Sequence, residues 1–155
     1  MNQHIIDKIA DLRNRLDEAD MYLGAGATQQ DIQVLCNRAK SELSEELPDQ
    51  YIEFLQSYDG LISGGVFIYS SVAHKFPDSD GYSRDFMTIN LILRDVDLMK
   101  EFLVFGDSDQ DEYVLELSSQ KYQVRDKQAI DNVFEEFGSF DELLEFMLDL
   151  IIQRS

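Results

Sequence analysis

The sequence predicts an α+β fold in which N-terminal helices precede a central antiparallel or mixed β-sheet, and a C-terminal amphipathic helix packs on that sheet. Helical periodicity before residue 60, short β-rich runs from residue 65 onward and an amphipathic stretch at the end of the chain support this prediction. No repeat, linker or low-complexity segment interrupts the 155 residues, and 44% of them are hydrophobic. We therefore expect a single domain that spans residues 1–155.

The first third of the chain is predicted to be helical. An apolar stripe with helical spacing is formed by Ile5, Ile9, Leu12 and Leu16. Thr28 is placed to cap a second helix, with Asp31 three residues later as a weak capping-box partner. Cys36 lies on the apolar stripe of this second helix, so we expect a small buried residue there.

A third helix, an exit turn and a strand follow each other without interruption in residues 47–69. Pro48 suits the first position of a helix, because a missing N–H group is not needed there. The apolar face of this helix is formed by Tyr51, Phe54, Leu55 and Tyr58. Gly60 is predicted to end it with a left-handed backbone, and residues 66–69 are predicted to form a strand.

The second half of the chain is predicted to supply most of the sheet. Residues 102–105 are apolar at every position and predict a central strand. Residues 113–117 alternate and predict a half-buried strand, and residues 122–125 return after a turn as a hairpin would. Ser139 and Glu142 form a capping box at the start of a last helix, whose apolar face is wide enough to cover one side of a sheet.

Two landmarks in this order resemble the SUKH superfamily. The first is the Leu-Pro-x-x-Tyr helix that ends in Tyr-Asp-Gly before a strand, and the second is the Phe-Gly-Asp sequence at residues 105–107 before a hairpin. With the closing helix, the resemblance covers residues 47–152. Asn90, Arg94 and the Gly-Ser-Phe sequence at residues 138–140 are most similar to the YrhA-like branch. The resemblance implies a short helix or turn around Asn90, although periodicity alone leaves residues 87–93 ambiguous between helix and strand.

The superfamily includes many bacterial immunity proteins and the yeast cell-wall-assembly regulators. The resemblance therefore implies an immunity protein, which binds the effector domain of a cognate bacterial toxin and neutralises it by direct occlusion without catalysis. The alternative is an intracellular regulatory or scaffold module that acts through protein interactions.

The net charge of -18 is spread over both halves of the sequence. Such a charge disfavours nucleic acid and anionic membranes, and it speeds encounter with a basic protein. The alternative is that the acidity serves solubility alone. No segment has the length and apolar character of a signal peptide or a membrane span, so we expect a cytoplasmic protein. The sequence leaves open whether it is a monomer or a homodimer.

No pattern in the sequence predicts catalysis, a metal or a cofactor. The alternating acids from Asp107 to Asp111 resemble the start of a calcium loop, but the required glycine and glutamate are replaced by Glu112 and Ser118. The two histidines, His4 and His74, lie far apart in the sequence, and we expect both at the surface. A Ser-His-Asp triad built on His74 would be chance, because no nucleophile-elbow sequence is present.

The surface loops remain as the predicted site of partner binding. Acidic residues and a tyrosine gather in two of them, and tyrosine suits interfaces because it offers a large area with a polar tip. The residues that we expect to contact a partner are Asp78, Asp80, Tyr82, Asp85, Asp107, Asp109, Asp111 and Glu112. The alternative is that these are ordinary solvated loop acids. Asp59 is expected to bond backbone in its turn, and Asn90 and Arg94 are expected to brace the fold.

Overall fold

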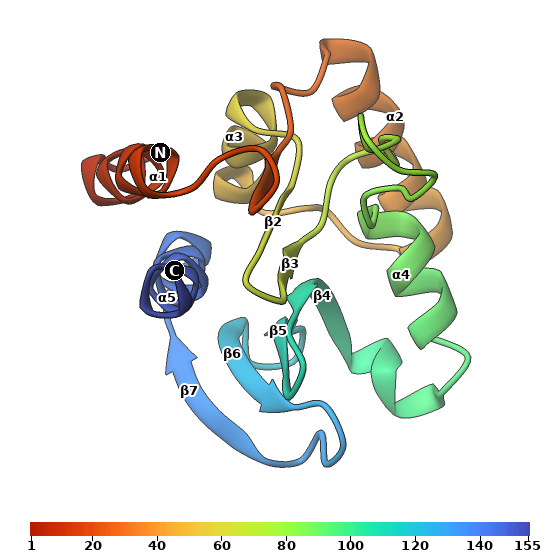
Figure 1. Ribbon diagram of the computed structural model, residues 1–155. Helices are drawn as coiled ribbons and strands as arrows, with labels where there is room; N and C mark the ends of the chain where they lie inside the picture. Colours follow the sequence, from red (N-terminus) through yellow and green to blue (C-terminus); the bar gives the residue numbers. More distant parts are fainter.

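The computed structural model describes all 155 residues as an α+β fold built on one antiparallel sheet (Figure 1). The helices are α1 (Gln3–Arg15), α2 (Gln29–Arg38), α3 (Asp49–Ser57), α4 (Phe86–Leu93) and α5 (Phe140–Arg154). A π-helical turn, η1 (Ala39–Leu43), follows α2, and a 3-10 helix, η2 (Asp97–Glu101), follows α4.

The seven strands pair in the order in which they occur in the chain, so the sheet is a continuous meander. They are β1 (Met21–Leu23), β2 (Leu61–Ser63), β3 (Val66–Ile68), β4 (Phe102–Asp107), β5 (Asp111–Glu116), β6 (Lys121–Asp126) and β7 (Val133–Phe137). All neighbouring strands are antiparallel. The predicted fold class is confirmed, with the sheet antiparallel throughout.

The N-caps predicted at Thr28 and Ser139 are confirmed. The Thr28 hydroxyl accepts a hydrogen bond from the Asp31 N–H at 3.1 Å, and the Ser139 hydroxyl accepts one from the Glu142 N–H at 3.3 Å. Gly60 has the expected left-handed backbone, with φ of +91°. The ambiguous segment around Asn90 is helical, as the resemblance implied.

Strand β4 is central and buried at every residue, as predicted. The prediction that β5 is half-buried is wrong, because Tyr113 and Val114 are both fully buried although they face opposite sides of the sheet. On one side Phe146 of α5 packs near the Tyr113 ring. On the other side Arg125 lies over the Phe102 ring, so that a long polar side chain covers the sheet there.

Three strands were not predicted. Strands β1 and β2 contain three residues each, which is too short for a periodic signal. Strand β7 is an edge strand whose first four residues are exposed, so it lacks the alternation of a strand that covers a core. Residues 72–76 turn away from the sheet, and only an isolated bridge between Lys75 and Tyr82 occurs there.

The core lies between the sheet and the helices, and Tyr51 of α3 is at its centre. Its ring packs at centroid distances of 4.9–5.6 Å against the rings of Phe86, Phe105 and Phe140. Figure 1 shows α1 and α5 side by side on one side of the molecule and α2 and α4 on the other. The aromatic helix α3 therefore connects the two helical flanks to the sheet.

Two predicted core positions are only half-buried. Tyr58 follows the last residue of α3 and has an extended backbone, so it leaves the buried stripe that begins at Tyr51. Cys36 is also half-buried on α2. Both residues lie at the margin of the core rather than inside it.

Candidate protein-interaction site

Asp107 is a buried ion-pair centre rather than a free surface acid. Its side chain is about 7% exposed, and its carboxylate accepts hydrogen bonds from the Tyr69 hydroxyl at 2.5 Å, from Arg84 at 2.9 Å and from Lys127 at 3.1 Å. Arg84 also lies 3.7 Å from the centre of the Phe67 ring. With two cations and a hydroxyl already bound, Asp107 braces the end of β4 and has little capacity left for a partner.

Glu112 is also buried, with 6% of its surface exposed. Burial raises the pKa of its carboxyl group, and the neighbouring Asp107 charge raises it further, while Lys127 acts in the opposite direction. Asp111 is half-buried, and its pKa is raised by burial first and then by Asp109 and Asp126. Ionisation of these two acids therefore works against folding.

The substitution Glu112→Gln is expected to stabilise the protein at neutral pH. A carboxyl group whose pKa is raised in the folded state holds its proton more tightly there than in the unfolded chain. Its destabilising effect is absent at acidic pH and develops as the pH rises from the ordinary glutamate value through the raised folded-state value. Thermal unfolding should show a higher Tm for the variant at pH 7 and a vanishing difference near pH 4. A lower Tm at pH 7 would mean that Lys127 attraction outweighs burial.

Asp109 is exposed but already paired. Its carboxylate lies 3.0 Å from an Arg154 nitrogen, and hydrogen bonding from Arg154 lowers its pKa. Arg154 also donates to the Gly64 carbonyl at 2.8 Å, so it joins the β4–β5 turn to the β2–β3 turn. The acids of the 107–112 turn are thus mostly committed within the protein.

The acids of the 78–85 loop are placed differently. Asp78 and Asp80 are exposed and take part in no ion pair, and Tyr82 is 59% exposed. Asp85 caps α4 by accepting a hydrogen bond from the Thr88 N–H at 3.0 Å. The Arg84–Asp107 pair joins the two predicted loops. The free carboxylates lie in the 78–85 loop.

A groove with a volume of about 490 Å³ lies beside this loop. One wall is formed by residues 18–22, at the start of β1, and the other by residues 76–79. Met21, Tyr22, Ile62 and Phe76 supply its apolar lining. The Tyr22 and Phe76 rings meet edge to face at a centroid distance of 5.2 Å across the two walls. The first wall was not predicted from the sequence, because residues 18–22 lack any motif or periodicity.

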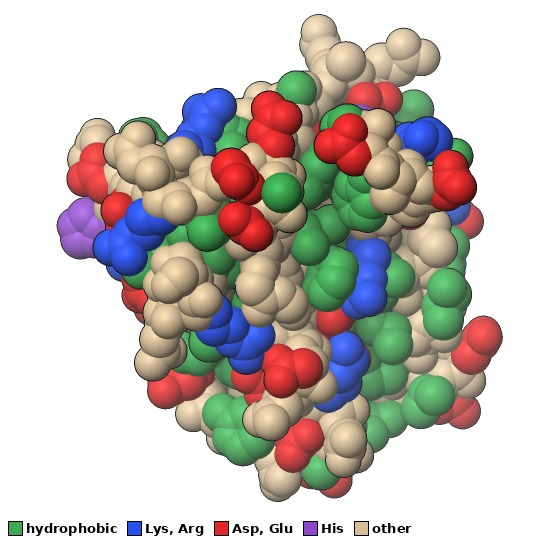
Figure 2. Space-filling view, viewed as in Figure 1, with side chains coloured by type: hydrophobic (Ala, Val, Ile, Leu, Met, Phe, Trp, Pro, Cys, Tyr) green, Lys and Arg blue, Asp and Glu red, His purple; other side chains and the backbone are tan.

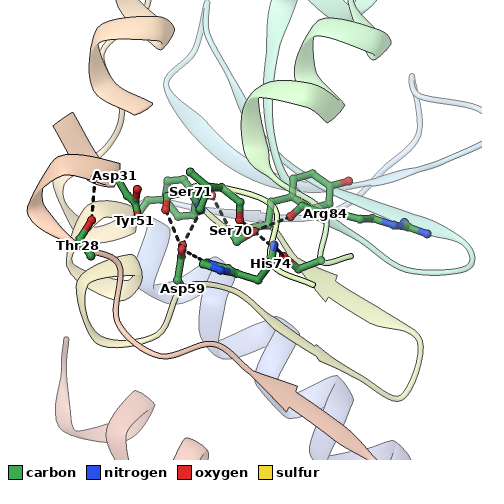
Figure 3. Close-up of polar contacts among 11 residues, drawn as sticks. Thr28, Asp31, Tyr51, Asp59, Ser70, Ser71, His74 and Arg84 are labelled. Atoms are coloured by element: carbon green, nitrogen blue, oxygen red, sulfur yellow. Dashed lines mark hydrogen bonds and ion pairs between the residues drawn. The ribbon is translucent and has the colours of Figure 1, made fainter. Parts of the chain in front are cut away.

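Asp59 holds the loop that carries the second wall (Figure 3). It is fully buried, and its carboxylate accepts hydrogen bonds from the Ser71 N–H at 2.6 Å and the Ser71 hydroxyl at 2.8 Å. His74 lies 2.5 Å from the same carboxylate through Nε2, and its side chain is 36% exposed. The expected backbone bond of Asp59 is present, but it reaches a residue outside its own turn. His74, expected to be an ordinary surface histidine, is instead paired.

The arrangement of these three residues is structural. A nucleophile–base–acid relay needs a serine hydroxyl on the imidazole, whereas the Ser71 hydroxyl is bonded to the carboxylate. The backbone N–H of His74 donates to the Ser83 hydroxyl at 2.9 Å, and the Ser83 hydroxyl contacts the Ser70 hydroxyl, so both ends of the loop are tied together. Asp59 is the central residue of the Tyr-Asp-Gly sequence, which was the one signal that could have located this cluster.

No group of three or more His, Cys, Asp or Glu side chains is placed to hold a metal ion. None of the helices has the length and apolar character needed to cross a membrane.

Comparison with known proteins places the chain in a family. No curated protein matches it. The model of the SMI1 / KNR4 family (SUKH-1) matches residues 26–145, which is most of the chain and includes Asp59, Asp107 and the second wall of the groove. The match does not separate the YrhA-like branch from others, and that branch remains a prediction. The chain belongs to the SMI1 / KNR4 family (SUKH-1), as the two sequence landmarks implied.

Proposed function

We propose that this protein is an immunity protein that binds the effector domain of a cognate bacterial toxin and blocks it by occlusion. The observation that carries the proposal is the groove, in which an apolar lining is bordered by exposed carboxylates that have no counterion in the chain. Family membership and the net charge of -18 are consistent with it. The inhibitor acts without catalysis, by covering the active surface of a basic effector domain.

Charge and apolar area have separate roles in this mechanism. Figure 2 shows acidic side chains scattered over the whole viewed face of the molecule, so the long-range field is not confined to one end. Such a field speeds encounter with a basic protein. The apolar lining supplies affinity, since a few well-buried anchor residues carry most of the binding energy in an interface of about 800 Å² per partner.

The test is a calorimetric titration at low and moderate salt. The titrant is the C-terminal domain of the protein encoded by the open reading frame immediately upstream of the gene for this chain. Nanomolar binding that weakens with salt, together with rescue of cells that express that domain, is the expected result. Absence of both binding and rescue would overturn the proposal. The protein would then be a regulatory or scaffold module of the same family, and its partner would be sought by pull-down from native cells.

A further inference from the structure

The border of the groove carries negative charge that the protein does not neutralise. Glu18, Asp20 and Asp78 are exposed, line the groove and form no ion pair. Arg154 is paired with Asp109, and Lys75 donates to the Ser79 carbonyl at 3.0 Å without pairing with a carboxylate. Three carboxylates therefore face one lysine at this border, and its net charge is negative. This differs from the 107–112 turn, where Asp107 and Asp109 have basic partners and Glu112 is buried.

The apolar lining and the charged border are adjacent rather than mixed. Tyr22, Ile62 and Phe76 are each half-buried, so they retain surface that a ligand could cover. The loop that carries the second wall is anchored to Asp59 at Ser71 and His74, and the Phe76 N–H bonds to the Gly81 carbonyl at 2.9 Å. Because this wall is already ordered, less conformational entropy is lost when a partner binds.

This combination selects the class of occupant. A second copy of the chain would bring another charge of -18 to an already acidic border, and nucleic acid would bring phosphates. A segment with one apolar residue between lysines or arginines fits both parts of the groove. Its apolar side chain is desolvated on the lining, and its cationic side chains pair with the carboxylates.

We propose that the groove between residues 18–22 and residues 76–79 binds a basic segment of the partner protein, with one apolar side chain seated on Tyr22, Ile62 and Phe76 and flanking cations on Glu18, Asp20 and Asp78. This inference rests on the proposed function, because it names the surface that such a partner would occupy.

The first test uses the full chain and the upstream effector domain. The double variant Asp20→Lys, Asp78→Lys should weaken binding by about tenfold or more and slow association. The matched control is Asp131→Lys, Glu135→Lys, which changes the net charge equally at two exposed residues without ion pairs near β7. The control should retain most of the affinity. Equal losses in both variants would overturn the groove as the binding surface.

The second test uses a probe that does not depend on the toxin. A five-residue peptide with phenylalanine between two pairs of lysines should shift the amide resonances of Met21, Tyr22 and Phe76 in heteronuclear NMR spectra. The same peptide with a central glycine should produce much smaller shifts. Equal shifts from both peptides, or shifts centred away from the groove, would contradict the inference.

The two tests separate this inference from the function itself. If toxin binding and rescue survive the Asp20→Lys, Asp78→Lys change, the groove is excluded as the binding surface, and the immunity function stands. If the peptide shifts the groove resonances but the protein neither binds the effector domain nor rescues cells, the groove is supported as a binding site for basic peptides, and the immunity function is excluded.

Discussion

Replacing Tyr51 by alanine is expected to lower the free energy of unfolding by about 3–5 kcal/mol. Its ring is fully buried and touches three other aromatic rings, from α4, β4 and α5, so truncation leaves a cavity where the helical flanks meet the sheet. The Tyr51 hydroxyl also donates to the Tyr69 carbonyl at 2.8 Å. Chemical denaturation of the purified variant measures the loss directly.

Two variants separate the parts of this effect. Tyr51→Phe removes only the hydroxyl and is expected to cost about 1 kcal/mol or slightly more, since it leaves the Tyr69 carbonyl without a donor. Tyr58→Ala, on the half-buried end of the same predicted stripe, should cost clearly less than Tyr51→Ala. Equal losses at Tyr51 and Tyr58 would mean that the core extends to the end of α3.

Tyr51 and Tyr58 show which features of α3 hydrophobic periodicity can predict and which it cannot. The spacing located α3 and its buried face, because the pattern from Tyr51 to Leu55 is local in sequence. It could not show that the helix stops at Ser57, because the turn is set by contacts with distant backbone. The Asp59 N–H bonds to the carbonyls of Gly24 and Ala25, and those partners come from a different part of the chain.

The same limit explains the outcome for the predicted site. The sequence identifies an acid but not the cation beside it, and Asp107 receives its cations from Arg84 and Lys127, about twenty residues away on either side. Asp78 has the same residue type and no such partner. Local sequence cannot distinguish the two, so two loops that looked alike have different roles in the structure.

The groove could not be predicted from the sequence for a related reason. Its two walls lie more than fifty residues apart in the chain, at residues 18–22 and 76–79. The pairing of β1 with β2 places Tyr22 beside Ile62, and Phe76 then packs on Tyr22. Both strands are too short to be recognised in the sequence. Motif-based prediction therefore located Asp78 but not the residues that face it.

The expected effect of Asn90→Leu is a loss of about 2–4 kcal/mol, because a single buried side chain satisfies both polar groups of one β4 residue. Asn90 is 1% exposed; its amide donates to the Val104 carbonyl at 2.8 Å, and its carbonyl oxygen accepts from the Val104 N–H at 2.8 Å. Leucine has a similar volume, so little of the loss would come from a cavity. The cost arises from two backbone groups left buried without partners.

The matched control is Thr88→Val, an exposed position on the same helix, where a change within about 0.5 kcal/mol is expected. Arg94, the second residue expected to brace the fold, bonds to the carbonyls of Leu43 and Phe102, so it cannot replace Asn90. An asparagine is needed here because β3 pairs with β4 only at Gly106 and Asp107, so no β3 residue lies opposite Val104. A side chain from α4 supplies the two bonds that a longer β3 would have made. If Asn90→Leu unfolds like Thr88→Val, the Val104 backbone is satisfied in some other way, and Asn90 does not brace the fold.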